Sequence, residues 1–130
     1  MDAQELIKRY QAGERDFQGI ELVTADLKGE TLRGINLARS NLTAVNLSWA
    51  DLRDAILTKA QLSRADLSYA NLSRADLGEA NLSRANLFKV NFFAANLRGA
   101  NLEGTQIGWA NRHQAIMPDG EVFGAKGDEN

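Results

Sequence analysis

The feature that most constrains this 130-residue chain is an apolar residue at every fifth position, in unbroken register from Phe17 to Ile107. Sixteen of these nineteen positions are Leu. The residue two before each is usually Ala, and the residue one before is Asp or Asn in fourteen of the nineteen. The repeat is therefore A-[D/N]-L-x-x, and the fold has to satisfy it nineteen times.

A period of five fits neither an α-helix nor a straight β-strand. On a helix each step of five residues turns the side chain by about 140°, which would scatter the Leu residues over every face. In a strand an odd step places successive Leu residues on opposite faces. If the chain bends once per pentad, every Leu points inward, the small Ala fits a crowded inner corner and the two x positions face water. The pattern predicts an all-β solenoid in which each coil contacts its neighbours.

The positions of the acidic residues favour a coil of 20 residues. A coil of 15 residues would stack Asp51 on Asp66, and like charges about 4.8 Å apart repel. With 20 residues no two acids are vertical neighbours, and stacked Asn side chains can hydrogen-bond to one another as amide ladders. One predicted column of the 20-residue register holds Asp26, Asn46, Asp66, Asn86 and Gln106.

The repeat also resembles a known family, the pentapeptide repeat proteins, in runs such as ADLSY at 65–69, ANLSR at 70–74 and ANLSR at 80–84. The resemblance covers residues 15–109 and is most similar to the small single-domain members abundant in cyanobacteria, most of which have no assigned biochemical role. It implies a right-handed quadrilateral β-helix with four pentads per coil. Nineteen pentads would then form about 4.75 coils.

Residues 1–14 are predicted to form a capping helix, because an uncovered strand edge at the end of a solenoid invites polymerisation. The helix is predicted over residues 2–12, with Asp2 as N-cap, Glu5 three residues later as in a capping box, and Gly13 as the stop. Its apolar stripe is expected to lie on the first coil and consists of Leu6, Ile7 and Tyr10.

Residues 110–130 are interpreted as a C-terminal cap and a flexible tail. The Leu repeat ends after Trp109, and four apolar residues flank a turn at Pro118-Asp119-Gly120. Residues 124–130 are polar, and we expect them to be disordered. The apolar residues that flank the turn are Ile116, Met117, Val122 and Phe123.

Composition indicates one domain, with 44% hydrophobic and 25% charged residues. No apolar run approaches the roughly 18 residues of a membrane span, and the first residues lack the features of a secretory signal. We therefore expect a cytoplasmic protein that does not associate with membranes. The chain has no Cys, which excludes disulfides, thiolate catalysis and Cys-ligated metals.

The sequence contains no constellation of catalytic residues. Its one histidine, His113, lies beside Arg112 in the C-terminal segment, with no evident nucleophile or metal-ligand set around it. The many Ser and Asp residues follow from the repeat and form no triad or carboxylate pair. We predict a protein that is not an enzyme and that uses no cofactor and no metal.

The resemblance brings an alternative function, since resistance-type members of the family resemble B-DNA in shape and charge and bind DNA gyrase. A duplex mimic must present a dense negative surface. Residues 15–109 carry eleven Lys or Arg and ten Asp or Glu, a net charge of +1. The chain also lacks the inserted loops and the long C-terminal dimerising helix of those members. The second x positions hold several basic residues, namely Arg39, Lys59, Arg64, Arg74, Arg84 and Lys89.

Direct binding of nucleic acid is also disfavoured. In the 20-residue register the basic residues form only a small positive strip, which acids such as Glu79 and Asp54 dilute. The overall charge of −2 provides no long-range attraction for a polyanion. We expect no nucleic acid partner.

The most distinctive outward feature is a stripe of aromatic residues. In the 20-residue register Trp49, Tyr69, Lys89 and Trp109 share one column, and Phe88 lies in the adjacent one. Exposed aromatic residues are candidates for a protein-binding surface, because they bring a large contact area at low entropic cost. In the competing interpretation the stripe packs on itself and the C-terminal cap covers Trp109 and Phe88.

These observations favour a non-enzymatic structural or protein-interaction module. Its mechanism would be the rigid display of side chains on flat faces. The candidate partner is another protein, and the module itself is expected to be a monomer. The sequence does not identify the partner or the pathway.

Overall fold

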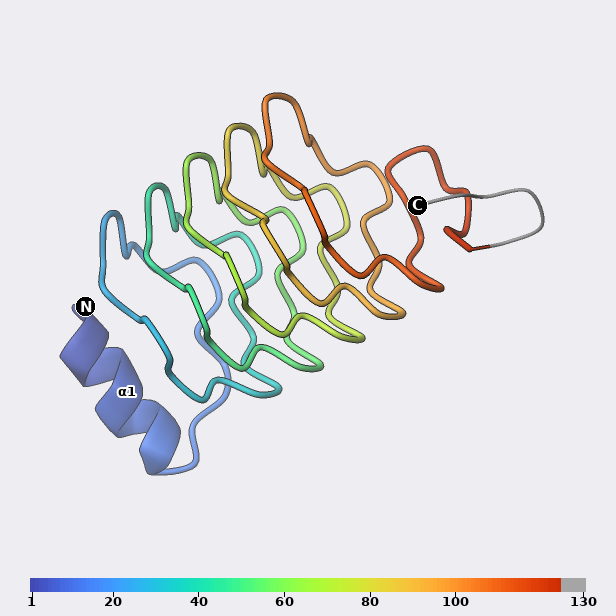
Figure 1. Cartoon of the computed structure of the whole chain (residues 1–130). Coiled ribbons are helices and arrows are strands. Elements are labelled where there is room, and N and C mark those ends of the chain that lie inside the picture. The colour runs from blue at the N-terminus through green and yellow to red at the C-terminus, as the bar shows by residue number, and fades with distance from the viewer. Residues whose placement is uncertain (125–130) are drawn as a thin grey trace.

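The computed structural model of the chain describes residues 1–124 and consists of one short helix followed by a stack of coils (Figure 1). Helix α1, Ala3–Gln11, lies across the first coil at one end of the stack. The red C-terminal segment stands beyond the last coil at the other end. The predicted solenoid with an N-terminal helix is confirmed.

Each coil contains 20 residues, as the arrangement of acids predicts. Parallel β-bridges join residues 20 apart, from Asp16 with Asn36 to Asn96 with Ile116. Two backbone hydrogen bonds flank each bridge; for example, the Leu47 amide donates to the Asp66 carbonyl at 2.8 Å. The bridges are isolated because the chain turns again after each pentad, so a face is too short for a longer strand.

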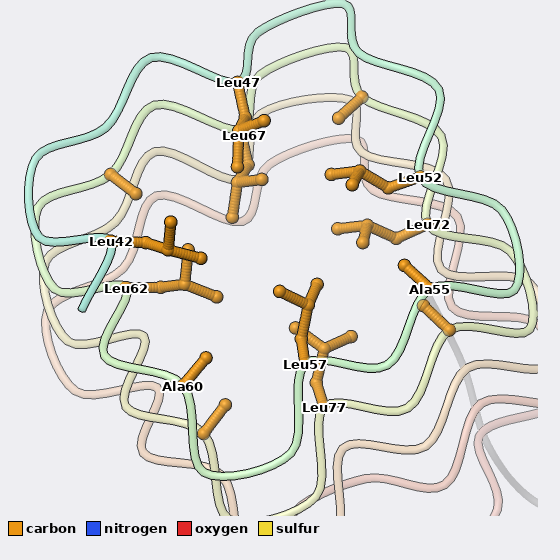
Figure 2. Packing of buried hydrophobic residues seen from close by; sticks show 14 of the residues in the cluster. Leu42, Leu47, Leu52, Ala55, Leu57, Ala60, Leu62, Leu67, Leu72 and Leu77 are labelled. Atoms are coloured by element: carbon orange, nitrogen blue, oxygen red, sulfur yellow. The ribbon is translucent and has the colours of Figure 1, made fainter. Parts of the chain in front are cut away.

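The Leu positions fill the interior of the stack. Leu42, Leu47, Leu52 and Leu57 point inward from four sides of one coil (Figure 2), and each has an exposed fraction of 0%. The Leu residues of the next coil lie directly beside them along the stack. Small Ala residues fill the space between neighbouring Leu columns, as Ala55 does. The inward assignment of Leu and Ala is confirmed.

A tight turn ends each pentad and carries the two outward x positions. In the turn that begins at Leu47, the Ala50 amide donates to the Leu47 carbonyl at 3.1 Å. The third residue of the turn, Trp49, has a φ of 62°, in the left-handed region. Gly29 occupies the same turn position one coil earlier with a φ of 70°, where glycine has no steric penalty. Non-glycine residues at this position in the other turns adopt the same conformation.

The Asp or Asn before each Leu caps the turn that follows. The Asn46 Oδ1 accepts a hydrogen bond from the Ser48 amide at 3.0 Å, and the same contact recurs along the stack. Amide ladders between coils are less regular than expected. Among residues 1–124 they join Asn96 to Asp76 at 3.1 Å and Asn111 to Asn91 at 3.3 Å. The Asp or Asn side chain therefore bonds mainly within its own turn, because the amide two residues later is always within reach.

Helix α1 covers the first coil through its apolar stripe. The Asp2 side chain accepts a hydrogen bond from the Glu5 amide at 2.8 Å, as expected of an N-cap. Leu6 is fully buried, and the Tyr10 hydroxyl donates to the Arg33 carbonyl at 2.6 Å. Within residues 1–124, no helix combines the length and the apolar character required to cross a membrane.

The coil continues past residue 109, where the Leu repeat ends. The Asn111 amide still donates to the Val90 carbonyl at 2.9 Å, and Arg112 occupies the next inward position in place of Leu. The chain then turns between Ile116 and Val122, which form an antiparallel bridge. The turn lies at Pro118-Asp119-Gly120, where the sequence predicts it. Of the predicted tail, residues 125–130 lie outside the described residues.

Candidate interaction surface

The five residues of the predicted stripe, which we call the aromatic surface, are Trp49, Tyr69, Phe88, Lys89 and Trp109. Backbone hydrogen bonds between coils set their spacing. The Trp49 amide donates to the Ser68 carbonyl at 3.0 Å, and the Tyr69 amide donates to the Phe88 carbonyl at 2.9 Å. The column therefore stands on a backbone ladder, which holds the side chains at one corner of the solenoid.

Trp49 and Tyr69 form a face-to-face stack. Their ring centroids are 4.3 Å apart and their planes differ by 1°. This arrangement follows from the register, since two αL turn residues one coil apart project in the same direction. Gly29 precedes Trp49 in the column and has no side chain, so one face of the indole stays uncovered and Trp49 is 60% exposed.

Phe88 and Lys89 close the other side of the Tyr69 ring. Phe88 meets Tyr69 edge to face at a centroid distance of 5.8 Å. The Lys89 Nζ lies 5.8 Å from the Tyr69 centroid and 5.7 Å from the Phe88 centroid, within range of a cation–π contact. Four of the five predicted residues thus form one packed cluster, as the self-packing interpretation expects.

Trp109 stands apart from this cluster. It is 82% exposed, and no ring contact joins it to another aromatic residue in the part of the chain that the structure describes. The competing interpretation, in which the C-terminal cap covers Trp109, is wrong on this point, because most of the indole is accessible. An exposed indole at the end of a rigid column is the most accessible apolar group of the aromatic surface.

Charged residues on the neighbouring corner are largely paired. The Arg74 guanidinium donates to Asp54 at 3.0 Å and, together with Arg33, holds the pKa of Asp54 below its usual value. The Arg53 side chain donates to Asp51 at 2.7 Å, and this hydrogen bond lowers the pKa of Asp51. Of the basic residues at the second x positions, Arg74 is the only one that forms an ion pair within residues 1–124.

A hollow of about 690 Å³ lies at another corner of the solenoid. Both basic and acidic side chains line it, among them Arg39, Lys59, Asp76 and Glu79. Such a mixture offers neither the single sign of charge that a polyanion requires nor a pair of convergent catalytic groups. We assign no site to it.

Within residues 1–124 the structure places no catalytic set around His113. Its ring lies against Phe93 at a centroid distance of 6.1 Å, and its backbone amide donates to Asn111 Oδ1 at 3.0 Å. Among residues 1–124, no group of three His, Cys, Asp or Glu side chains has the geometry to hold a metal ion.

Sequence reasoning missed one residue with unusual chemistry, Arg112. It takes an inward position of the last coil, and its Nε is buried without a hydrogen-bond partner in the described residues. The guanidinium lies over the Phe123 ring at 4.3 Å. The signal was present in the sequence, because the frame of five places residue 112 at the next Leu position after Ile107.

Comparison with known proteins identifies the family. The family of Pentapeptide repeats matches residues 20–58, 46–84, 60–93 and 85–107. The chain belongs to this family, and its fold is the right-handed quadrilateral β-helix that the sequence resemblance implies. No protein with curated function matches the sequence.

Similar solved structures are also pentapeptide repeat proteins. One, from the thylakoid lumen of Arabidopsis thaliana, is 33% identical, with 82% of this chain and 70% of that chain covered and a TM-score of 0.53. One from the cyanobacterium Nostoc is 35% identical, with 84% and 85% covered and a TM-score of 0.41. HetL, involved in the regulation of heterocyst differentiation in Nostoc, is 22% identical, with 94% and 99% covered and a TM-score of 0.41.

Proposed function

We propose that this pentapeptide repeat protein is a non-enzymatic module that binds a protein partner through the aromatic surface. One observation carries the proposal: Trp49 and Trp109 are 60% and 82% exposed although they stand on one rigid column. Large exposed aromatic side chains are enriched among the residues that dominate binding energy in protein interfaces. In this proposal the protein acts in the cytoplasm as a monomer.

The rigidity of the corner supports the proposal. Hydrogen bonds to the next coil and the side-chain cap of each turn hold the backbone under Trp49. The stack with Tyr69 restricts the indole further. Binding therefore costs little additional conformational entropy, which is the condition under which exposed aromatic groups contribute most to affinity.

Photo-crosslinking tests the proposal. A photoreactive phenylalanine analogue replaces Trp109 in one variant and Lys59, which has the same αL turn geometry at another corner, in a control. The variants are irradiated in extract of the source cells, and a protein crosslinked only at position 109 is then purified. We expect it to bind the wild-type chain and to lose at least about tenfold in affinity for the combined Trp49→Ser and Trp109→Ser variant.

Equal affinity of the purified partner for wild type and the double variant would refute the proposal. Equal crosslinking at positions 59 and 109 would do the same, since it would show no preference for the aromatic corner. Circular dichroism controls for folding, and sedimentation velocity tests the monomeric state.

A further inference from the structure

The last coil leaves one of its strand edges open. In the coil before it, the Leu82 amide donates to the Asn101 carbonyl at 2.8 Å and the Leu87 amide donates to the Gln106 carbonyl at 2.7 Å. The equivalent amides of Leu102 and Ile107 have no acceptor within residues 1–124. The Trp109 amide and the carbonyls of residues 100 and 105 are likewise unpaired there.

The first coil also has unpaired amides, at Glu21, Asp26 and Thr31 within residues 1–124, but a helix packs against that end. Helix α1 covers the first coil with the fully buried Leu6. At the C-terminal end the hairpin covers only part of the last coil, where the Gln114 amide donates to the Phe123 carbonyl at 2.9 Å. The open edge at this end therefore includes residues 102–109. An unpaired edge of this kind is a template for an added strand.

Apolar side chains beneath this edge are incompletely covered. Leu82 and Leu87 are 0% exposed, whereas Leu102 and Ile107 at the same positions of the last coil are only half-buried. Beside them lies a cavity of about 440 Å³, lined by Ile107, Trp109, Ala110, Asn111 and Arg112. A strand laid on the edge would cover the apolar groups and fill the cavity with a side chain.

Arg112 supplies the only formal charge in the lining of this cavity. Its Nε is buried and has no hydrogen-bond partner in the described residues, which is costly unless a ligand satisfies it. Asp119 and Glu121 line a separate hollow that Arg112 also lines, and neither forms an ion pair with Arg112 among residues 1–124. A carboxylate entering the cavity would meet Arg112 as its charge partner.

We propose that the open edge binds a peptide segment of another protein, which follows the turns of the coil and adds further β-bridges to it, with an acidic side chain of that segment paired to Arg112. The inference shares Trp109 with the aromatic surface but uses none of the cluster of Trp49, Tyr69, Phe88 and Lys89. It goes beyond the proposed function by naming the chemistry of the ligand. Backbone hydrogen bonds to residues 102–109 provide affinity, and the cavity with Arg112 provides selectivity.

A single strand fits this edge better than a second copy of the chain. The C-terminal segment stands beyond the last coil (Figure 1), so the flat end of another solenoid would meet it before reaching the open edge. A symmetric end-to-end pair would also bring a second copy of Arg112 to the same interface with no additional acid in the cavity. A peptide avoids both problems.

Fluorescence anisotropy with synthetic peptides tests the inference. The probe is a labelled, end-capped peptide of alternating Thr and Val with one central Glu, and its match carries Gln instead. We expect the full-length chain to bind the Glu peptide about tenfold more tightly than the Gln peptide. A third peptide, N-methylated on alternate residues, lacks the backbone donors for strand pairing and should bind at least tenfold more weakly than its parent.

Two protein variants assign the preference to Arg112. Arg112→Leu places an apolar residue at an inward position that Phe92 and Leu72 occupy in the two preceding coils, so the variant should fold, and it should lose the tenfold preference for Glu. Arg64→Leu, at an exposed corner away from the edge, should retain it. The affinities for the Glu and Gln peptides should both be unchanged when Trp49 and Tyr69 are replaced by Ser. This variant therefore distinguishes peptide binding at the edge from partner binding at the cluster around Trp49.

Three results would overturn the inference. They are equal binding of the Glu and Gln peptides or no binding of either, undiminished binding of the N-methylated peptide, and retention of the preference in Arg112→Leu. Sedimentation equilibrium provides a further test. A wild-type dimer that dissociates in Arg112→Leu would identify the edge as an interface between two copies and contradict the peptide.

Discussion

Asp66 accepts two hydrogen bonds from Ser68 through one oxygen: its Oδ1 lies 3.0 Å from the Ser68 amide and 2.6 Å from the Ser68 hydroxyl. Asn46 and Ser48 repeat the pair one coil earlier, at 3.0 Å and 2.7 Å. The relationship explains why Asp or Asn precedes Leu, and why Ser so often follows it. Each turn that Asp or Asn precedes contains its own cap, so these corners do not depend on side-chain contacts between coils.

Removing such a cap should lower stability measurably. We expect Asp66→Ala to reduce the free energy of unfolding by about 1 kcal/mol, because the Ser68 amide loses its acceptor. Asp66→Asn keeps an Oδ1 acceptor and should lose less than half of that amount. Urea unfolding monitored by circular dichroism measures both. Equal losses for the two variants would show that the charge of Asp66, and not the turn cap, matters.

A charge at an inward Leu position should abolish folding. Leu67 is 0% exposed in the middle of the stack. Leu67→Lys would bury an ammonium group with no partner, at a cost of several kcal/mol, and neighbouring coils depend on one another for their burial. We expect loss of the cooperative thermal transition, whereas Leu67→Met should cost less than about 1.5 kcal/mol. Native-like melting of Leu67→Lys would refute the inward assignment.

The stack of Trp49 on Tyr69 should be detectable as an energetic coupling. In a double-mutant cycle with Ser at both positions, we expect a coupling of about 0.5–1.5 kcal/mol in the free energy of unfolding. Trp109→Ser removes no ring contact and should change stability by less than about 0.5 kcal/mol. If the effects of the two Ser substitutions on the free energy of unfolding are strictly additive, the stack contributes buried area but no specific interaction between the rings.

Acid should weaken the interaction between Asp51 and Arg53. The Arg53 guanidinium holds the folded-state pKa of Asp51 below its usual value. The stabilisation is therefore complete above the unfolded value of about 3.9 and is lost as the pH falls through the lower folded pKa. Between pH 7 and pH 3 the wild type should lose more stability than Asp51→Asn.

Carboxyl NMR titration checks the cause of this shift directly. The pKa of Asp51 should rise in Arg53→Gln, because the substitution removes the charged donor. An unchanged pKa in that variant would assign the shift to the backbone amide of residue 53, which also donates to Asp51 at 3.2 Å.

DNA gyrase should be unaffected by this chain. The repeat region carries a net charge of +1, so it lacks the dense negative surface of a duplex mimic. A supercoiling assay with the purified protein in large molar excess over gyrase should show the same rate as buffer alone. Potent inhibition would overturn the charge argument and restore the alternative function.

The sequence by itself determined the parts of the fold that depend on period. An apolar residue every five positions, as at Leu47 and Leu52, excludes both a helix and a straight strand, because only a chain that turns once per pentad can bury all of them. The separation of acids such as Asp26 and Asp66 indicated the 20-residue coil that the bridges show. Helix α1 could be predicted from its N-cap and its apolar stripe, since both are local features of the sequence.

Only the tertiary structure decided what happens at the surface and at the last coil. The register placed Trp49 and Tyr69 in one column, but side-chain torsions and neighbours decide that their rings stack while Trp109 stays free. The coil also continues past the last Leu repeat, because its backbone hydrogen bonds to the previous coil do not depend on which side chain points inward. Arg112 therefore takes a half-buried inward position, next to an edge that no further coil covers within the described residues.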